Sequence, residues 1–80
     1  MKKRIRVRFE NIMKTLYSDL NLKIYYLGSG NNLYLIEYLS KYQVYFDYNF
    51  DETVYDNIRR CKKYMEFKIV DELIRRLEDE

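Results

Sequence analysis

The chain has 80 residues, of which 48% are hydrophobic and 35% are charged, and its formal net charge is +2 at pH 7. This composition supports one small domain over residues 1–80 with a hydrophobic core, and it excludes an extended disordered chain. No stretch approaches the roughly 18 apolar residues of a membrane-spanning helix, so no membrane partner is expected. Histidine is absent. The most common general base and transition-metal ligand is therefore missing.

The remaining composition favours a cytoplasmic protein. A single cysteine, Cys61, cannot form an internal disulfide, as is typical of reducing compartments. Ten tyrosines occur alongside no alanine or proline. This bias suits an AT-rich genome and favours a virus or mobile element as the source.

Charge is distributed unevenly along the chain. Residues 1–9 contain five cations and no acid, whereas the chain ends in three consecutive acids. A basic start and an acidic end can steer partners, and they can also neutralise each other between protomers.

The first half of the chain predicts a strand, a helix and part of a meander. Ile5, Val7 and Phe9 alternate with cations, which predicts a half-buried strand over residues 3–9. The apolar period then changes, and a short amphipathic helix is expected over residues 10–20.

Three further segments predict an antiparallel meander. Strands are expected over residues 22–27, 33–39 and 42–50, with a hairpin loop over residues 28–32 and a tight turn near Ser40. In the last strand one face is expected to carry Tyr42, Val44, Phe46, Tyr48 and Phe50, and the other Gln43, Tyr45, Asp47 and Asn49. Residues 33–42 also fit a helical period, which leaves a helix as the alternative there.

Residues 51–80 predict one long helix whose apolar residues change direction. Asp51 is the expected N-cap. A first stripe comprises Val54, Ile58, Cys61 and Met65, and a second comprises Ile69, Val70, Leu73, Ile74 and Leu77, roughly 120° away. Either the helix breaks near residues 66–68 and returns to the core, or its second half packs against a partner. The expected fold class is α+β in the order β-α-β-β-β-α, with the meander packed against a short helix and a long, optionally kinked C-terminal helix.

The sequence predicts a protein without enzymatic activity, bound metal or cofactor. Cys61 lies on the first stripe and is expected to be a buried structural thiol. Asp47, Asp51, Glu52 and Asp56 match no calcium-loop spacing, and acids at a helix start need no ligand to explain them. No catalytic residue is therefore assigned.

The function predicted first is a small cytoplasmic regulator or inhibitor that occludes a macromolecular partner, most simply a protein, and forms a homodimer. Surplus apolar surface is the reason. The expected partner or dimer interface comprises Phe67, Val70, Leu73, Ile74 and Leu77.

Nucleic-acid binding is the first alternative, because basic residues interleave with aromatic ones. The expected basic and aromatic face comprises Arg4, Arg6, Arg8, Tyr25, Tyr45, Arg59, Arg60, Lys62 and Lys63. The helix–meander–helix order resembles that of double-stranded-RNA-binding domains. Those domains open their second helix with lysines, whereas this one opens with Asp51 and Glu52.

A histidine-free ribonuclease is the remote alternative. A basic first strand, a helix and a terminal meander is similar in order to small toxin ribonucleases of the RelE type. That resemblance implies phosphate chemistry supported by Arg, Lys and Tyr, and it extends to no catalytic motif in this chain.

Overall fold

The N-terminal segment forms a helix throughout. In the computed structural model, which describes residues 2–28 and 32–79, helix α1 spans Lys2–Leu16. The strand predicted at residues 3–9 is therefore wrong. Phe9 belongs to both candidate patterns, and in the helix Met13 lies one turn further along the same face, with both side chains fully buried. Val7, which the alternating pattern required to share the face of Phe9, remains 46% exposed.

The helix predicted at residues 10–20 is the second half of α1 followed by a separate 3-10 turn. This turn, η1, spans Ser18–Leu20. Asn21 then adopts a left-handed conformation with φ of 53°, which ends the helical segment and turns the chain toward the sheet.

The meander is confirmed. Strands β1 (Lys23–Tyr26), β2 (Leu33–Tyr38) and β3 (Tyr42–Asp47) form an antiparallel sheet in the order β1-β2-β3. The helical alternative for residues 33–42 is wrong. Leu39 and Ser40 both have positive φ in the turn before β3, close to the predicted position. The predicted loop at residues 28–32 lies partly outside the described residues. At its ends the Leu27 amide donates to the Leu33 carbonyl at 2.8 Å.

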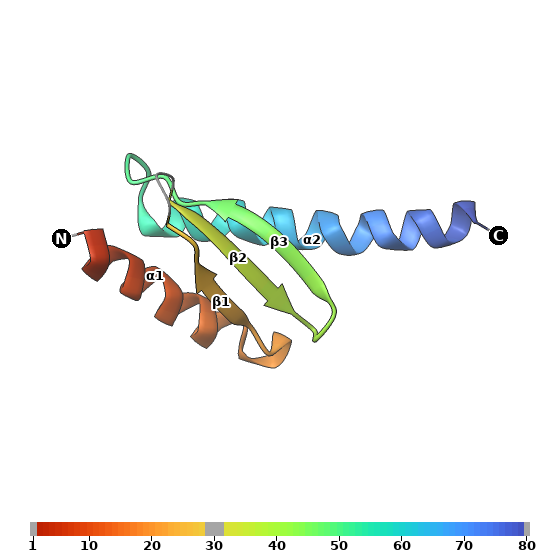
Figure 1. Cartoon of the computed structure of the whole chain (residues 1–80), viewed down its shortest axis with the longest axis horizontal. Coiled ribbons are helices and arrows are strands. Elements are labelled where there is room, and N and C mark those ends of the chain that lie inside the picture. Colours follow the sequence, from red (N-terminus) through yellow and green to blue (C-terminus); the bar gives the residue numbers. More distant parts are fainter. Residues whose placement is uncertain (1, 29–31, 80) are drawn as a thin grey trace.

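The C-terminal helix is continuous. Helix α2 spans Val54–Glu78, so of the two alternatives left open for its second half, the break near residues 66–68 is wrong. Its N-cap is Thr53, not the predicted Asp51, because the Thr53 side-chain oxygen accepts a hydrogen bond from the Asp56 amide at 3.1 Å. The C-terminal part of α2 extends well beyond the end of the sheet (Figure 1).

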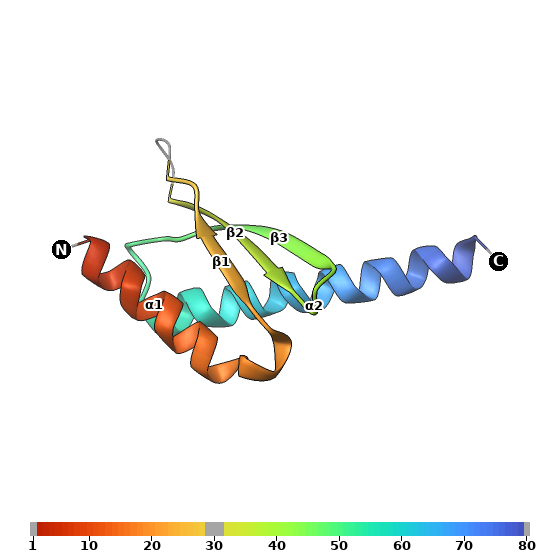
Figure 2. The same cartoon turned by 60° about the horizontal axis from the view of Figure 1, so that its bottom comes forward.

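Both helices pack on one face of the sheet (Figure 2). The ring centroid of Phe9 in α1 lies 5.4 Å from that of Tyr34 and 5.6 Å from that of Phe46. On β2, Tyr34, Ile36 and Tyr38 are fully buried beneath the helices. The α+β class is confirmed, with the order helix, meander, helix and an opposite sheet face that neither helix covers.

Candidate functional site

Helix α2 is anchored to the core through one narrow face. Ile58, Cys61 and Met65 are buried, as the first predicted stripe requires. The Tyr38 hydroxyl donates a hydrogen bond of 2.7 Å to the Met65 carbonyl. Ile69 is the last apolar residue of the helix that packs on the core. Beyond it the core provides no further contact for the apolar residues of α2.

The opposite side of α2 carries an exposed apolar surface, which we call the back stripe. It comprises Phe67, Val70, Leu73, Ile74 and Leu77. Phe67 is 65% exposed and Leu77 is 72% exposed. At about 100° per residue, the back stripe points roughly 150° away from the buried face, and the second predicted stripe, which has Ile69 in place of Phe67, points roughly 120° away. A straight helix therefore presents these side chains to solvent along its last three turns.

The back stripe has the spacing of a coiled-coil seam. Phe67, Val70, Ile74 and Leu77 follow steps of three, four and three residues. A shallow hollow of about 440 Å³ lies at its first end, lined by Lys63, Glu66, Phe67 and Val70. This spacing suits a partner helix laid along α2.

The charges beside the back stripe are mainly acidic. On the helical wheel Glu66, Asp71 and Glu78 flank it, and Lys63 lies at its first end, whereas the cations of the last turns lie on the other side of the helix. Those cations are Lys68, Arg75 and Arg76. A partner with basic residues beside an apolar row would therefore complement this surface.

The predicted basic and aromatic face does not form one surface. Arg4, Arg6 and Arg8 lie on α1, and two of them contact tyrosines. The Arg6 guanidinium lies 3.8 Å from the centroid of the Tyr26 ring, and the Arg8 guanidinium donates to the Tyr55 hydroxyl at 3.4 Å. Arg4 remains exposed on α1.

Tyr25 and Tyr45 lie on the open face of the sheet, away from both helices. Each is paired in register with Leu35, so the three side chains form a row across the strands. Both tyrosines are exposed. The sheet therefore separates this row from the cations of α1 that were expected beside it.

The basic residues of α2 are already engaged locally. Arg59 pairs with Asp56 at 3.0 Å, and Lys62 pairs with Glu66 at 3.8 Å. Lys63 is exposed at the start of the back stripe. Arg59 and Lys62 therefore form ordinary surface pairs within α2.

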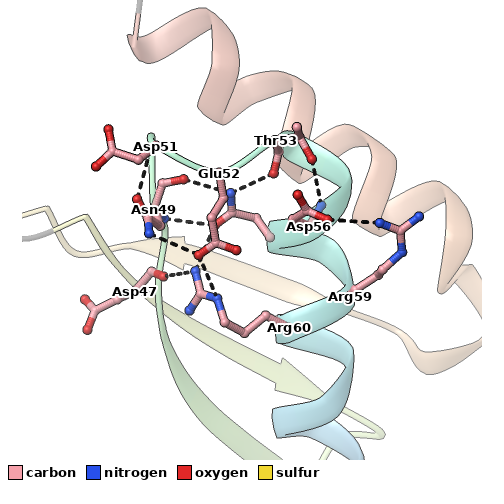
Figure 3. Close-up of polar contacts among 9 residues, drawn as sticks. Asp47, Asn49, Asp51, Glu52, Thr53, Asp56, Arg59 and Arg60 are labelled. Atoms are coloured by element: carbon pink, nitrogen blue, oxygen red, sulfur yellow. Dashed lines mark hydrogen bonds and ion pairs between the residues drawn. The ribbon is translucent and has the colours of Figure 1, made fainter.

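A polar cluster joins β3 to the start of α2 (Figure 3). Asn57, fully buried, donates from its side-chain nitrogen to the carbonyls of Asn49 and Thr53, each at 2.9 Å. Its side-chain oxygen accepts from the Asn49 amide at 2.8 Å and from Arg60 at 2.9 Å. The Arg60 guanidinium also donates to the Asp47 carbonyl at 2.9 Å and lies 3.4 Å from Glu52.

This cluster is a structural device that the sequence interpretation missed. It fixes the direction in which α2 leaves the sheet. The available signal was Asn57 itself, a polar residue placed four positions before Cys61 on the buried side of α2. A depression of about 750 Å³ lies beside the cluster, and Arg60 and Glu52 in its wall are already paired with each other.

The titratable groups of the core are held in their neutral forms. Burial raises the pKa of the Cys61 thiol to about 12, which removes the thiolate needed for nucleophilic attack. Burial raises the pKa of Tyr38 to about 12 and also raises that of Tyr34, where the Glu10 carboxylate contributes further. Within residues 2–28 and 32–79, no group of three or more acidic or cysteine residues is placed to hold a metal ion.

Comparison with known proteins provides no functional guide. No protein family, curated protein or solved structure matches this chain. In the described part of the chain, neither α1 nor α2 has the length and apolar character needed to cross a bilayer.

Proposed function

We propose that the protein is a non-enzymatic binding module that uses the back stripe of α2 to cover part of a macromolecular partner in the cytoplasm. The observation that carries this proposal is the row of half-exposed apolar residues on α2. The helix is continuous, and this row is not used to pack the helix on the core. Soluble monomers rarely leave such a row uncovered, and helix-in-groove recognition uses the same residue spacing.

Regulation by occlusion is the simplest activity for such a module. A helix protruding from a small folded body can fill a groove while the body blocks access to the surroundings. A second copy of the chain is one partner that would bury the back stripe, and a virus or mobile element would be a natural source for an inhibitor of this size.

The proposal is tested by affinity capture with a matched pair of variants. The wild-type chain should retain a specific protein from its native host, identified by mass spectrometry. The double variant L73D/L77D should lose it, because two charges would enter the apolar seam. Leu39→Asp, which alters an exposed leucine at the β2–β3 turn, should retain it. If L73D/L77D captures the same protein as the wild type, the stripe is not the binding surface.

Nucleic-acid binding is a second candidate, favoured by the cations at the start of α1. Lys2, Lys3 and Arg4 are exposed, and the first turn of α1 contains no acid. Titration with DNA and RNA at two salt concentrations tests it, since phosphate contacts weaken steeply with salt. Binding without salt dependence, or binding unaffected by replacing Lys2 and Arg4 with serine, would exclude this candidate.

A further inference from the structure

We infer that the occupant of the back stripe is helix α1 of a second copy of the chain, so that two copies form a closed pair with two identical contacts. This inference rests on the proposed binding role of the back stripe and names its partner. It is carried by matching apolar rows, by opposite charges and by the positions of the two helix ends.

Helix α1 exposes an apolar row of the same length as the back stripe. This row, the α1 stripe, comprises Ile5, Ile12 and Leu16. Leu16 is 58% exposed, and Ile12 is only partly buried against the core. With a rise of 1.5 Å per residue, the α1 stripe is about 16 Å long, and the back stripe from Phe67 to Leu77 is about 15 Å long.

An antiparallel alignment matches three positions of the two rows, whereas Leu73 and Ile74 fall opposite the buried Phe9 and the cation Arg8. When Leu77 lies opposite Ile5, Val70 lies opposite Ile12 and Phe67 falls within one residue of Leu16. Hollows lie beside both ends of the α1 stripe. One of about 400 Å³ is lined by residues that include Ile5, Phe50, Val54 and Tyr55. Another of about 230 Å³ is lined by Asn11, Ile12, Thr15 and Leu16.

The same alignment brings opposite charges together. Lys2, Lys3 and Arg4 sit at the positive end of the α1 dipole, where cations are unfavourable. Glu78 and Asp79 sit at the negative end of α2, where acids are unfavourable. In the antiparallel pair the acidic end of one chain lies against the basic end of the other, so each charge cluster offsets the other.

The contact requires two chains. The N-terminus of α1 and the C-terminus of α2 lie at opposite ends of a molecule 50 Å long, so they cannot meet within one copy (Figure 1). Two α2 helices are the poorer pairing. Glu66, Asp71 and Glu78 flank the seam. Pairing the back stripes of two α2 helices, parallel or antiparallel, would place these acids beside one another or beside Leu73.

Closure into a pair follows from the small size of one contact. A stable interface usually involves about 20–30 residues on each side, more than one stripe and one helix face supply. A two-fold axis would place the back stripe of each chain on α1 of the other chain. This doubles the contact and covers the back stripe and the α1 stripe of both chains.

A charge-swap experiment on purified protein tests the inference. The variants are K2E/R4E on α1 and E78K/D79K on α2. Each places charges that suit its helix end. K2E/R4E also removes the contact of Lys2 with the Phe50 ring, so circular dichroism is used to verify that both variants fold. Sedimentation equilibrium at ~50 mM salt, where surface charges are weakly screened, gives the dimer dissociation constant.

The expected result is a wild-type dimer that weakens at least about tenfold in either variant. An equimolar mixture of K2E/R4E and E78K/D79K should restore the dimer, with one chain of each kind by native mass spectrometry. The inference is overturned by a monomeric wild type at ~1 mM, by open chains longer than two copies, or by no restoration in the mixture. It is also overturned if E78K/D79K strengthens the dimer or leaves it unchanged while K2E/R4E has no effect, which is the result for α2 pairing with α2.

The proposed function is judged separately from this result. A monomeric chain whose captured partner is lost in L73D/L77D would overturn the second-copy inference and leave the binding role intact. If L73D/L77D changed neither capture nor self-association, both would fall. If K2E/R4E changed only nucleic-acid retention, the cations of α1 would belong to a nucleic-acid site and the inference would be overturned.

Discussion

Replacing Asn57 with alanine should unfold this protein more effectively than any surface change. The substitution removes all four hydrogen bonds of a fully buried side chain. The Asn49 amide and carbonyl both lose their partner in a part-buried setting, at about 1 kcal/mol each. The deleted side-chain atoms leave a small cavity that adds about 1 kcal/mol. The expected loss is therefore about 3 kcal/mol of the free energy of unfolding.

That loss is large for a chain of this size. Domains of 80 residues have about 4–12 kcal/mol of stability in total, and about 3 kcal/mol corresponds to a fall in Tm of about 12–24 °C. Urea and thermal denaturation followed by circular dichroism measure both quantities. Asn11→Ala on the exposed side of α1 is the matched control, because it makes the same gain in helix propensity without touching a buried group. If the two variants differed by less than about 1 kcal/mol, the cluster would not be what positions α2.

Two further predictions concern the core. The Cys61 thiol should resist labelling reagents at pH 8 until the protein unfolds. Because its pKa rises to about 12 from an ordinary 9.0, its contribution to stability should be full below pH 9 and lost as the pH rises toward 12. Denaturation at several alkaline pH values checks this, and Cys61→Ser should show a smaller loss over the same range. Tyr38→Phe should cost about 1 kcal/mol through the lost bond to the Met65 carbonyl, whereas Tyr45→Phe on the open sheet face should change the unfolding midpoint negligibly.

The last strand and the first half of the long helix were predictable because their patterns have a single interpretation. In β3 the buried side chains of Tyr42, Val44 and Phe46 alternate strictly with exposed ones, and only a strand buries these three together. The apolar row from Ile58 to Met65 similarly fits only a helix. The boundary between the two elements was predicted less well: β3 ends at Asp47 and not at residue 50, and α2 begins at Val54 and not at residue 51.

The N-terminal segment was ambiguous because two periods share the same residues. Ile5 and Phe9 lie two alternating steps apart on a strand and one turn apart on a helix. The choice depended on Met13, which extends the helical face into the core, and on a long-range contact of Phe9 with Phe46 that local pattern does not contain. Tertiary packing decided between the two.

The candidate site was predictable in its residues and not in its geometry. The exposed apolar residues of α2 were identified from the wheel, but a kink would have returned them to the core. Whether the helix stays straight depends on what the core can cover, and Ile69 is its last apolar contact. The separation of Tyr25 and Tyr45 from the α1 cations likewise depends on which face of the sheet the helices pack on. The sequence alone does not show which face of the sheet the helices cover.

A helix anchored at one end has a gradient of local stability along its length. The turns around Cys61 can open only when the core opens, whereas the turns around Ile74 are held by little more than their own backbone hydrogen bonds. Amide protons should therefore exchange progressively faster toward Leu77 and Glu78. Fraying of this kind would let the final turns of α2 adjust their conformation as they bind a partner's groove. Folding of these turns would then be coupled to binding.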